Sequence, residues 1–469
     1  MSKKNQNYTN RKQNRFQPER MRGNIFVNNS GKQWLPGKNG RAAKVERLLR
    51  GLEKKEIAGN MAGYKDSGIE YIGQVPKDWE VLRLKNISNI YAAKEYLFGE
   101  WPVEKNGKPY SPFGEWSSGN EVIITGRVGT IGQYEMLEKN PKKKILINDN
   151  RLLIRPFTED YRKKALSHFL FWAMAIVNLN DIITGSAVPL ITATSLLKKR
   201  IVVPPLSEQQ RIADFLDTKC GILDRTIDAV SQQIEDLEKY KKALITKTVT
   251  KGIYKKGEPE RAMKDSGVEW IGEVPEEWDV KRNSLNFDIR KTLVGENWSN
   301  MQLLSLTTNG VKNITIDDQV GKRPKTLATY QIAHKNDIVM CLFDLDASAV
   351  FSGLCKKNGI ISPAYKLLKC KNGMFPPYAE YYFRAVFDGR KYKKYAKSIR
   401  YTISTNDFMH LKMPVPPLAE QQQIADYLDE KCKNINNRVQ KRRQQLEWLK
   451  EYKKSLIFDY VTGKKRVEK

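Results

Sequence analysis

Two short segments have residue types that could bind a nucleotide. Gly126-Arg-Val-Gly129-Thr-Ile-Gly132 carries three glycines, but their spacing differs from the dinucleotide-binding fingerprint and no helical pattern follows. Thr462-Gly-Lys-Lys465 lacks the first glycine and the final hydroxyl of a P-loop. We therefore expect a tight hairpin at the first segment and no ATP hydrolysis at the second.

Metal chemistry is also disfavoured by the residue types. His168, His334 and His410 are the three histidines, too far apart in the sequence to indicate a zinc or HNH site, and no acidic motif of a metal-dependent nuclease is present. The five cysteines form no C-x-x-C pair, so we expect buried or incidental thiols. We therefore predict no metal site in this chain.

One tetrad invites a catalytic interpretation. Phe375-Pro-Pro-Tyr378 is similar to the Asn/Asp-Pro-Pro-aromatic tetrad of adenine methyltransferases, whose first residue accepts a hydrogen bond from the amino group to be methylated. Phe375 has no acceptor, and no glycine-rich loop follows a strand to bind a methyl donor. We expect a turn before a helix that starts at Tyr378, and we expect no catalytic residue. A self-contained methyltransferase or nuclease is therefore the less favoured hypothesis.

The charge indicates a polyanionic partner. The 469 residues include 82 Lys+Arg and 53 Asp+Glu, for a net charge of +29. We predict DNA contacts on turns near strand ends, where Arg127 could pair with guanine, and on the basic and aromatic run 390–401, which could follow phosphates. The alternatives are a solvated hairpin tip and a solvated helix face. The predicted DNA-binding residues are Arg127, Thr130, Ser186, Thr192, Lys391, Lys394, Arg400 and Tyr401.

The chain repeats itself, and the repeat predicts the elements that position these residues. KDSGIEYIGQVPKDWEV begins at Lys65 and returns with few changes from Lys264, at an offset of 264 − 65 = 199. PPLSEQQRIADFLDTKC begins at Pro204 and returns from Pro416, at an offset of 416 − 204 = 212. We call these four segments the frame blocks. They enclose two inserts, 82–203 and 281–415, that show no alignment by eye, as expected for one scaffold with two recognition surfaces.

Both inserts have mixed α/β patterns. We predict strands at 121–125, 144–148 and 151–155 and a helix at 161–179 in the first insert. In the second insert we predict strands at 337–343 and 364–370 and a helix at 378–387. The similar order favours divergence from one ancestor. The fold class predicted is α/β (α+β), duplicated and pseudo-twofold symmetric.

A long helix follows each proline pair. Ser207 and Gln210 have the form of a capping box, although Ala419 replaces the serine in the second copy. Apolar residues then recur in alternating steps of four and three, the heptad pattern of a coiled coil, so we predict that the two helices pair antiparallel. They would hold the inserts at a fixed separation; the alternative is that each helix covers its own domain. The predicted pairing residues are Leu216, Leu223, Ile227, Val230, Ile234, Leu237, Leu244, Leu428, Ile435, Val439, Leu446, Leu449 and Leu456.

These repeated blocks resemble the specificity subunit of type I restriction-modification systems. The resemblance extends from Lys65 to the C-terminus, and Tyr71 and Gln74 depart from the W-I-G-E-V-P-x-x-W form of the first block. It implies a non-catalytic subunit whose inserts are target-recognition domains, each reading one half of a bipartite double-stranded DNA sequence. It also implies that the helices form a spacer and dock two methyltransferase subunits. Restriction/translocase subunits would join them, and S-adenosylmethionine, ATP and Mg²⁺ would bind to partners and none to this chain.

The resemblance sets the domain boundaries that we expect. Residues 1–60 carry 15 Lys+Arg and 4 Asp+Glu and form a basic, disordered extension of undecided role. Target-recognition domains occupy 61–203 and 256–415, and spacer helices occupy 204–255 and 416–469. No secretory signal or membrane-length apolar run is present, so the cytoplasm is expected. Two further alternatives are a specificity factor for methylation without a nuclease partner and a basic coiled-coil scaffold that binds RNA.

Overall fold

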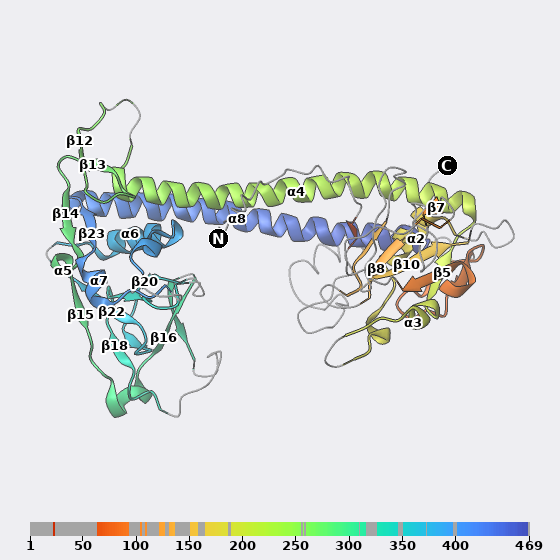
Figure 1. Cartoon of the computed structure of the whole chain (residues 1–469), viewed down its shortest axis with the longest axis horizontal. Helices are drawn as coiled ribbons and strands as arrows, with labels where there is room; N and C mark the ends of the chain where they lie inside the picture. Colours follow the sequence, from red (N-terminus) through yellow and green to blue (C-terminus); the bar gives the residue numbers. More distant parts are fainter. Residues whose placement is uncertain are drawn as a thin grey trace, which may run out of the picture. The chain divides into compact units, whose positions relative to one another are not determined.

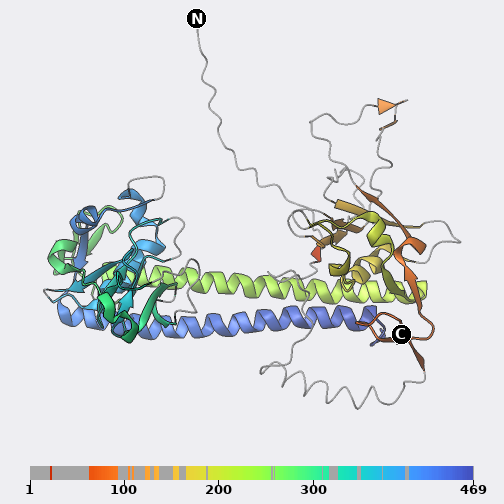
Figure 2. The ribbon, with the colours of Figure 1, turned by 90° about the horizontal axis from the view of Figure 1, so that it is seen from below.

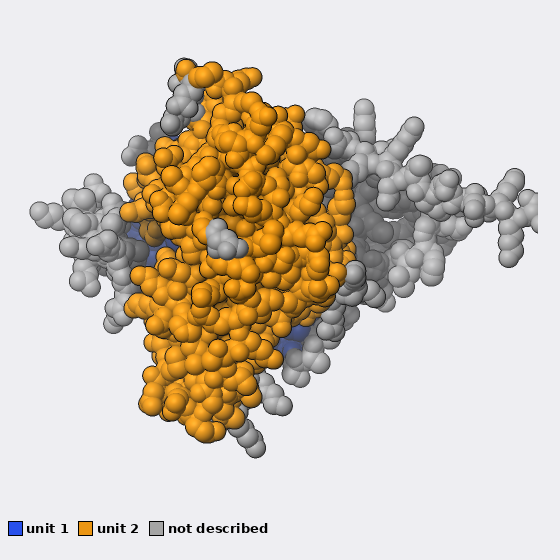
Figure 3. All heavy atoms as spheres, turned by 90° about the vertical axis from the view of Figure 1, so that its left-hand side faces the viewer, with its two compact units in different colours: residues 1–227, 447–469 blue, residues 228–446 orange. Residues whose placement is uncertain are grey.

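The structure is a computed structural model, and the chain forms two compact units. Unit 1 comprises residues 1–227 and 447–469, and unit 2 comprises residues 228–446 (Figure 3). The structure describes residues 22–23, 63–92, 104–105, 108–109, 122–126, 131–136, 151–157, 165–185, 189–254, 257, 259–308, 310–315, 326–345, 350–371, 373–396 and 401–467.

Two long helices contribute to both units. Helix α4 (Leu206–Lys251) has 46 residues and α8 (Leu418–Val461) has 44, so α4 is roughly 69 Å long at 1.5 Å per residue. Figures 1 and 2 show α4 and α8 side by side. They are antiparallel: Lys241 of α4 contacts Asn436 of α8, whereas Glu238, three residues earlier in α4, contacts Arg443, later in α8. All thirteen predicted pairing residues are buried or half-buried.

The start of each helix differs from the prediction. Helix α4 already begins at Leu206, so Ser207 lies inside the first turn, and the side chain of Gln210 donates to Asp214 at 2.8 Å. The capping box is therefore wrong. The carbonyl of Pro205 accepts instead from the backbone N–H of Gln209 at 3.0 Å, and Pro417 and Gln421 repeat this contact in α8 at 3.0 Å. Because Ser207 and Ala419 both lie inside the first turn, neither is the N-cap, and alanine can occupy this position.

The insert of unit 1 forms an antiparallel sheet. Its order is β1 (Arg22–Gly23, which precedes the insert in the chain), β9 (Tyr134–Met136), β8 (Val122–Thr125), β10 (Arg151–Pro156) and β5 (Ser88–Ala92). Strands β8 and β9 flank the glycine segment as a hairpin, as predicted. Helix α2 (Ser167–Met174) packs on β8 and β9 and is shorter than the predicted 161–179, and α3 (Ala193–Leu197) follows. The predicted strand 144–148 lies outside the described residues.

The insert of unit 2 contains two sheets. The first has the order β15 (Phe287–Arg290), β22 (Lys366–Cys370), β19 (Ile338–Met340) and β20 (Ser352–Leu354). The second has the order β17 (Gly310–Ile314), β16 (Leu303–Thr307), β21 (Gly359–Ile361) and β18 (Gln331–Ala333), and β16 pairs with β21 in parallel. Helices α6 (Pro376–Asp388) and α7 (Thr405–His410) follow. The three elements predicted in this insert are present with shifted ends.

The two inserts share a core. The order β5-β10-β8-β9 in unit 1 matches β15-β22-β19-β20 in unit 2, with antiparallel neighbours throughout. In each unit two helices follow, α2 with α3 and α6 with α7. The second sheet is seen only in unit 2 among the described residues. The shared order confirms the predicted similarity of the two inserts.

A two-stranded ribbon closes each insert. In unit 1, β4 (Glu80–Arg83) pairs antiparallel with β11 (Arg200–Val203). In unit 2, β14 (Asp279–Arg282) pairs in the same register with β23 (Lys412–Val415). The chain therefore enters and leaves each insert at one place.

The remaining elements are β2 (Tyr64–Asp66), β3 (Gln74–Pro76), β6 (Glu104–Lys105), β7 (Lys108–Pro109), β12 (Met263–Asp265), β13 (Glu273–Pro275), α5 (Asn283–Asn286) and the short 3-10 helices η2 (Leu84–Asn86), η3 (Asn180–Ile182), η4 (Gly295–Asn300) and η5 (Lys391–Lys394).

The hydrophobic core of each unit includes both long helices. Unit 1 buries Leu216 of α4 and Ile457 of α8 against its insert, and unit 2 buries Val249 of α4 and Leu428 of α8 against its own. Four of the five cysteines are buried and all are free, as expected. Among the described residues, no helix is long and apolar enough to cross a membrane.

Candidate nucleic-acid interface

The frame blocks join each insert to the start of a long helix through a buried tryptophan. The indole Nε1 of Trp79 donates to Oε2 of Glu208 at 3.0 Å, and Trp278 donates to Oε2 of Glu420 at 2.8 Å. Both tryptophans are fully buried. The duplicated W and E of the sequence therefore form the same contact twice, and this contact accounts for both motifs without catalysis.

In unit 2 an arginine completes this contact. Arg261 donates to both carboxylate oxygens of Glu420, at 2.6 and 3.1 Å, and also pairs with Glu277. The hydrogen bonds to Glu420 raise the pKa of Arg261, and the hydrogen bond from Arg261 lowers the pKa of Glu277. A carboxylate with a bidentate guanidinium and an indole partner holds its geometry firmly.

In unit 1 the equivalent arginine comes from the C-terminal end of the chain. Arg466 lies after α8, its Nε is 3.6 Å from Oε1 of Glu208, and it donates to Asp78 at 2.6 Å. The carbonyl of Gly463 accepts from the hydroxyl of Tyr64 at 2.9 Å. The C-terminal segment therefore closes unit 1 as the segment after α4 closes unit 2.

The glutamine after each glutamate orients the first helix that follows the sheet. The side-chain Oε1 of Gln209 accepts from the backbone N–H of Leu166 at 2.8 Å, at the start of α2. Gln421 accepts from the N–H of Phe375 at 2.8 Å, at the start of α6. In both copies Nε2 donates at 2.8 Å to the carbonyl of the proline five residues earlier. The frame thus fixes the orientation of the surfaces that the inserts present.

The tetrad has a structural role. Phe375 is the N-cap of α6, and the helix begins at Pro376, two residues before the predicted start. The hydroxyl of Tyr378 is buried and donates to the carbonyl of Pro414 at 2.9 Å, with the carbonyl of Val249 as a second acceptor at 3.2 Å. Burial raises its pKa.

Two of the three histidines, His168 and His410, have local contacts. His168 Nδ1 lies 3.1 Å from Asp217, which also accepts from the indole of Trp172 at 2.8 Å. His410 Nδ1 lies 2.7 Å from a backbone carbonyl one turn earlier. No group of three His, Cys, Asp or Glu side chains that could hold a metal ion occurs in the part of the chain that the structure describes.

The predicted DNA contacts separate into two groups. Arg127, Thr130, Ser186 and Arg400 lie outside the described residues. Thr192 is the N-cap of α3, where its hydroxyl accepts from the N–H of Ser195 at 3.1 Å. Ser404 is the N-cap of α7, the corresponding helix of unit 2, and its hydroxyl accepts from the N–H of Asp407 at 3.0 Å. The hydroxyls of Thr192 and Ser404 therefore both cap a helix.

The second group comes together on one surface of unit 2. Lys391 and Lys394 occupy η5, where Lys391 lies over the ring of Trp270 at 5.9 Å and Lys394 pairs with the exposed Glu269. Lys393 lies over the ring of Tyr401 at 4.5 Å. Exposed pairs of this kind are worth at most about 1 kcal/mol, so the ammonium groups keep most of their capacity to bind phosphate.

A second basic surface was missed by the sequence analysis. Lys335 lies on the turn between β18 and β19, Lys356 and Lys357 lie on the turn between β20 and β21, and all three are exposed. The backbone N–H of Lys335 donates to the side chain of Asn358 at 2.7 Å and joins the turns. We call Lys335, Lys356 and Lys357 the turn pair, after the two turns on which they lie. The sequence shows only the short run K-K-N-G at 356–359. The turn with Lys335 lies about 20 residues earlier, and no sequence pattern links the two turns.

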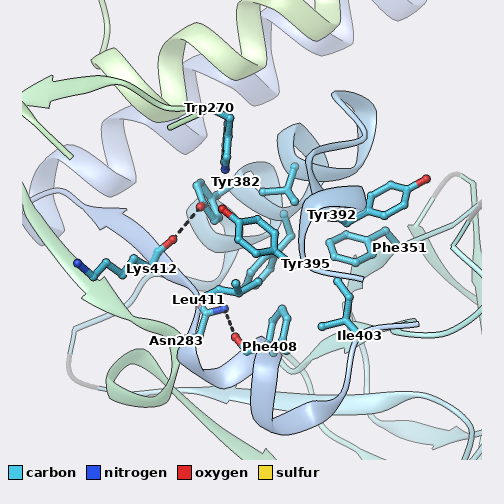
Figure 4. A pocket seen from close by; sticks show the side chains of 12 residues that line it. Trp270, Asn283, Phe351, Tyr382, Tyr392, Tyr395, Ile403, Phe408, Leu411 and Lys412 are labelled. Atoms are coloured by element: carbon cyan, nitrogen blue, oxygen red, sulfur yellow. Dashed lines mark hydrogen bonds between the residues drawn. The ribbon is translucent and has the colours of Figure 1, made fainter. Parts of the chain in front are cut away.

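Unit 2 also contains an aromatic cavity beside η5 (Figure 4). Trp270, Tyr382, Tyr395 and Phe408 line it, and the hydroxyl of Tyr382 donates to the carbonyl of Lys412 at 3.2 Å. Its volume is about 20 Å³, enough for one water molecule. A flipped nucleobase or a methyl donor does not fit.

Comparison with known proteins gives a family for this architecture. The model of the type I restriction modification DNA specificity domain matches residues 76–239 and 308–447, one match in each copy. The specificity subunit of the type I restriction enzyme MjaVIII from Methanocaldococcus jannaschii is 24% identical over 436 residues, covering 84% of this chain and 95% of the relative. The putative MjaX specificity subunit from the same organism is 24% identical and covers 85% and 96%.

A solved structure has the same fold. A chain described in work on complex assembly and conformational transition of the type I R-M system matches with a TM-score of 0.57 and 15% identity, covering 83% of this chain and 99% of that one. The fold and the duplicated frame thus define a two-domain DNA-recognition subunit. The chain belongs to the family of type I restriction-modification DNA specificity subunits. It has two target-recognition domains, and subunits of this class are non-catalytic.

Proposed function

We propose that each recognition domain reads one half of a bipartite duplex DNA target. The observation that carries this proposal is the repetition of one sheet order and one set of Trp-Glu-Gln contacts beneath two inserts of different sequence. A fixed frame with two different surfaces suits two different half-sites. The domains that we propose are 61–203 and 256–415, with 204–255 and 416–469 as spacer helices.

Phosphate contacts would supply most of the binding energy and groove contacts the discrimination. In unit 2 we assign the phosphate contacts to the turn pair and to Lys391 and Lys394 of η5. Asn358 and Asn336 are exposed beside the turn pair, and side-chain amides can pair bidentately with adenine in the major groove. In the first domain Arg127 and Thr130 of the glycine hairpin remain the proposed contacts.

Two methyltransferase subunits would dock on the long helices. Tyr240 of α4 and Tyr452 of α8 occupy equivalent positions in the repeat and are 58% and 46% exposed. Leu206 and Leu418 are a second equivalent pair, 39% and 48% exposed. Apolar side chains that stay exposed in both copies favour two copies of one partner, because an intramolecular role would bury them.

The chemistry would belong to the partners. We propose that S-adenosylmethionine, ATP and Mg²⁺ bind to methyltransferase and restriction/translocase subunits, and that the complex acts in the cytoplasm, where its target DNA is.

Base-resolution mapping of methylated adenines tests the proposal. The chain is expressed with its methyltransferase in a host that has no other modification system. We expect methylation at one asymmetric, split sequence, and none when either subunit is expressed alone. Methylation of a continuous sequence, or methyl transfer by this chain alone, would contradict the proposal. Restriction of unmethylated phage DNA on adding a translocase subunit distinguishes a complete system from one that only methylates.

A further inference from the structure

The apolar seam between α4 and α8 is interrupted by one lysine in each unit. In unit 2 the ammonium Nζ of Lys241 donates to Oδ1 of Asn436 at 2.9 Å. In unit 1 Nζ of Lys453 donates to both oxygens of Asp224, at 2.6 and 2.7 Å. Lys241 and Lys453 occupy heptad seam positions, and both are half-buried. Burial, then the charge of Arg384, lowers the pKa of Lys241.

The two contacts have one register. The step along α4 from Asp224 to Lys241 equals the step along α8 from Asn436 to Lys453, since 241 − 224 = 453 − 436. Equal steps in opposite directions mean that both contacts belong to the same antiparallel alignment. The repeat also relates Lys241 to Lys453 and Asp224 to Asn436, so one polar contact is made twice.

Apolar heptads alone do not define this alignment, because a slip of one heptad places the seam of one helix against the seam of the other once more. A slip in one direction would set Lys241 level with Arg443, a like charge. A slip in the other direction would set it level with Asp429, whose carboxylate already accepts from the hydroxyl of Tyr381 at 2.6 Å.

A slip of one heptad also gives Lys453, the seam lysine of unit 1, a different partner. The second direction of slip would set Lys453 level with Asp217, which already accepts from Trp172 and lies beside His168. Both alternative acceptors are therefore occupied by side chains of the first helix after the sheet, α2 or α6. In either direction of slip, therefore, at least one lysine meets a like charge or must share a carboxylate that already has a hydrogen-bond partner.

We propose that the Lys241–Asn436 and Lys453–Asp224 contacts fix the axial register of α4 against α8, and thereby the spacer length that the subunit accepts between its two half-sites. The four residues act as positioning residues. The link to spacer length rests on the proposed bipartite recognition. A one-heptad slip moves a helix by about 10.5 Å, or roughly three base pairs of duplex at 3.4 Å each. Smaller displacements correspond to single base pairs.

The test compares Lys241→Met/Lys453→Met with the control Lys239→Met/Lys450→Met. Methionine keeps the length of the side chain and continues the apolar seam. The control removes two lysines from the same helices whose ion pairs, with Glu235 and Glu447, are within one helix. A second variant, Asp224→Lys/Lys453→Asp, exchanges the charges of one contact and preserves it.

Two readouts are used. Spin labels on unnatural amino acids at Gln233 and Gln444, both exposed and both in unit 2, report the register of the helices in the subunit alone. Methylation by the complete complex on the native target, and on targets with the spacer changed by one base pair, reports spacer selectivity. If the wild-type complex methylates no target, the proposed function is wrong. The distance between the labels would still report whether the two contacts fix the register of the helices.

For the methionine pair we expect a broadened label distance and a preference for the native spacer reduced at least fivefold. The control and the charge exchange should keep the wild-type distance and preference. An unchanged spacer preference in the methionine pair, with the wild-type complex active, would overturn the proposal. So would relaxed selectivity in the control.

Discussion

The indole of Trp278 donates a hydrogen bond to the carboxylate of Glu420, 142 residues later in the chain. Trp79 and Glu208 form the same bond in the other unit. Each bond ties the strand that enters an insert to the first turn of a long helix. The contact that fixes the recognition surface is therefore provided by the repeated sequence and not by the variable one.

Glu420→Gln should destabilise unit 2 by about 1–3 kcal/mol, because it removes the charge that faces Arg261 inside a partly buried network. The matched control is Glu277→Gln, which removes the more exposed carboxylate partner of the same arginine and should cost less than about 1 kcal/mol. Hydrogen exchange resolved by peptide distinguishes the units. Faster exchange in residues 263–282 with unit 1 unchanged is expected; equal effects of the two variants would contradict the assigned role.

Replacing Lys335, Lys356 and Lys357 together by Gln should weaken DNA binding similarly for all sequences and reduce the slope of log K against log salt by about 2–3. The reason is that the three phosphate contacts that we propose for the turn pair would be lost. Titration of the complex with DNA at several salt concentrations measures the slope. Lys239→Gln, on the exposed face of α4, should leave the slope unchanged. No change in slope for the triple variant would remove the turn pair from the interface.

We proposed that two methyltransferase subunits dock on the long helices; on this proposal Tyr240→Ser and Tyr452→Ser should each remove one of them, and the double variant should remove both. Native mass spectrometry of the complex counts them. Tyr254→Ser is the control, because Tyr254 is 71% exposed yet has no aromatic equivalent in the repeat. A full complement of partners on the double variant would show that docking occurs elsewhere.

The stability of unit 2 should depend on the protonation of Glu380 in α6. Burial raises its pKa to about 7, and its Oε2 has no hydrogen-bond partner among the described residues. The folded state therefore favours the protonated acid. The stabilisation is present below the pKa of the unfolded chain and is lost as the pH rises toward 7. Glu380→Gln should remove this dependence, with a difference from wild type of about 2 kcal/mol between pH 5 and 8 by urea unfolding. Parallel pH curves for both proteins would contradict this.

Local patterns predicted much of this fold. The heptads of α4 and α8 and strands such as Arg151–Pro156 depend on residues within a short window, and the duplication is visible as repeated segments, so all three could be predicted. The second sheet of unit 2 was missed because its pairs, such as Leu303 with Ile360, join residues far apart in the chain. The capping box was wrong because the helix begins directly after the second proline, which places Ser207 inside the first turn.

The site was less predictable than the fold. Glu208 and Glu420 were noticed as repeated letters, yet their tryptophan partners lie far away in the sequence. The turn pair has no periodic signal, because two separate turns meet only in the folded sheet. Thr192 was selected as a polar turn residue, whereas its hydroxyl caps α3.

Exchange of the insert tests the central claim most directly. Residues 82–203 are replaced by the corresponding insert of another specificity subunit, with the frame blocks, α4 and α8 unchanged, and the methylated sequence is mapped. One half-site should change, while the other half-site and the spacer length stay the same. A change in both half-sites, or in the spacer, would contradict the account of two independent recognition surfaces on one repeated frame.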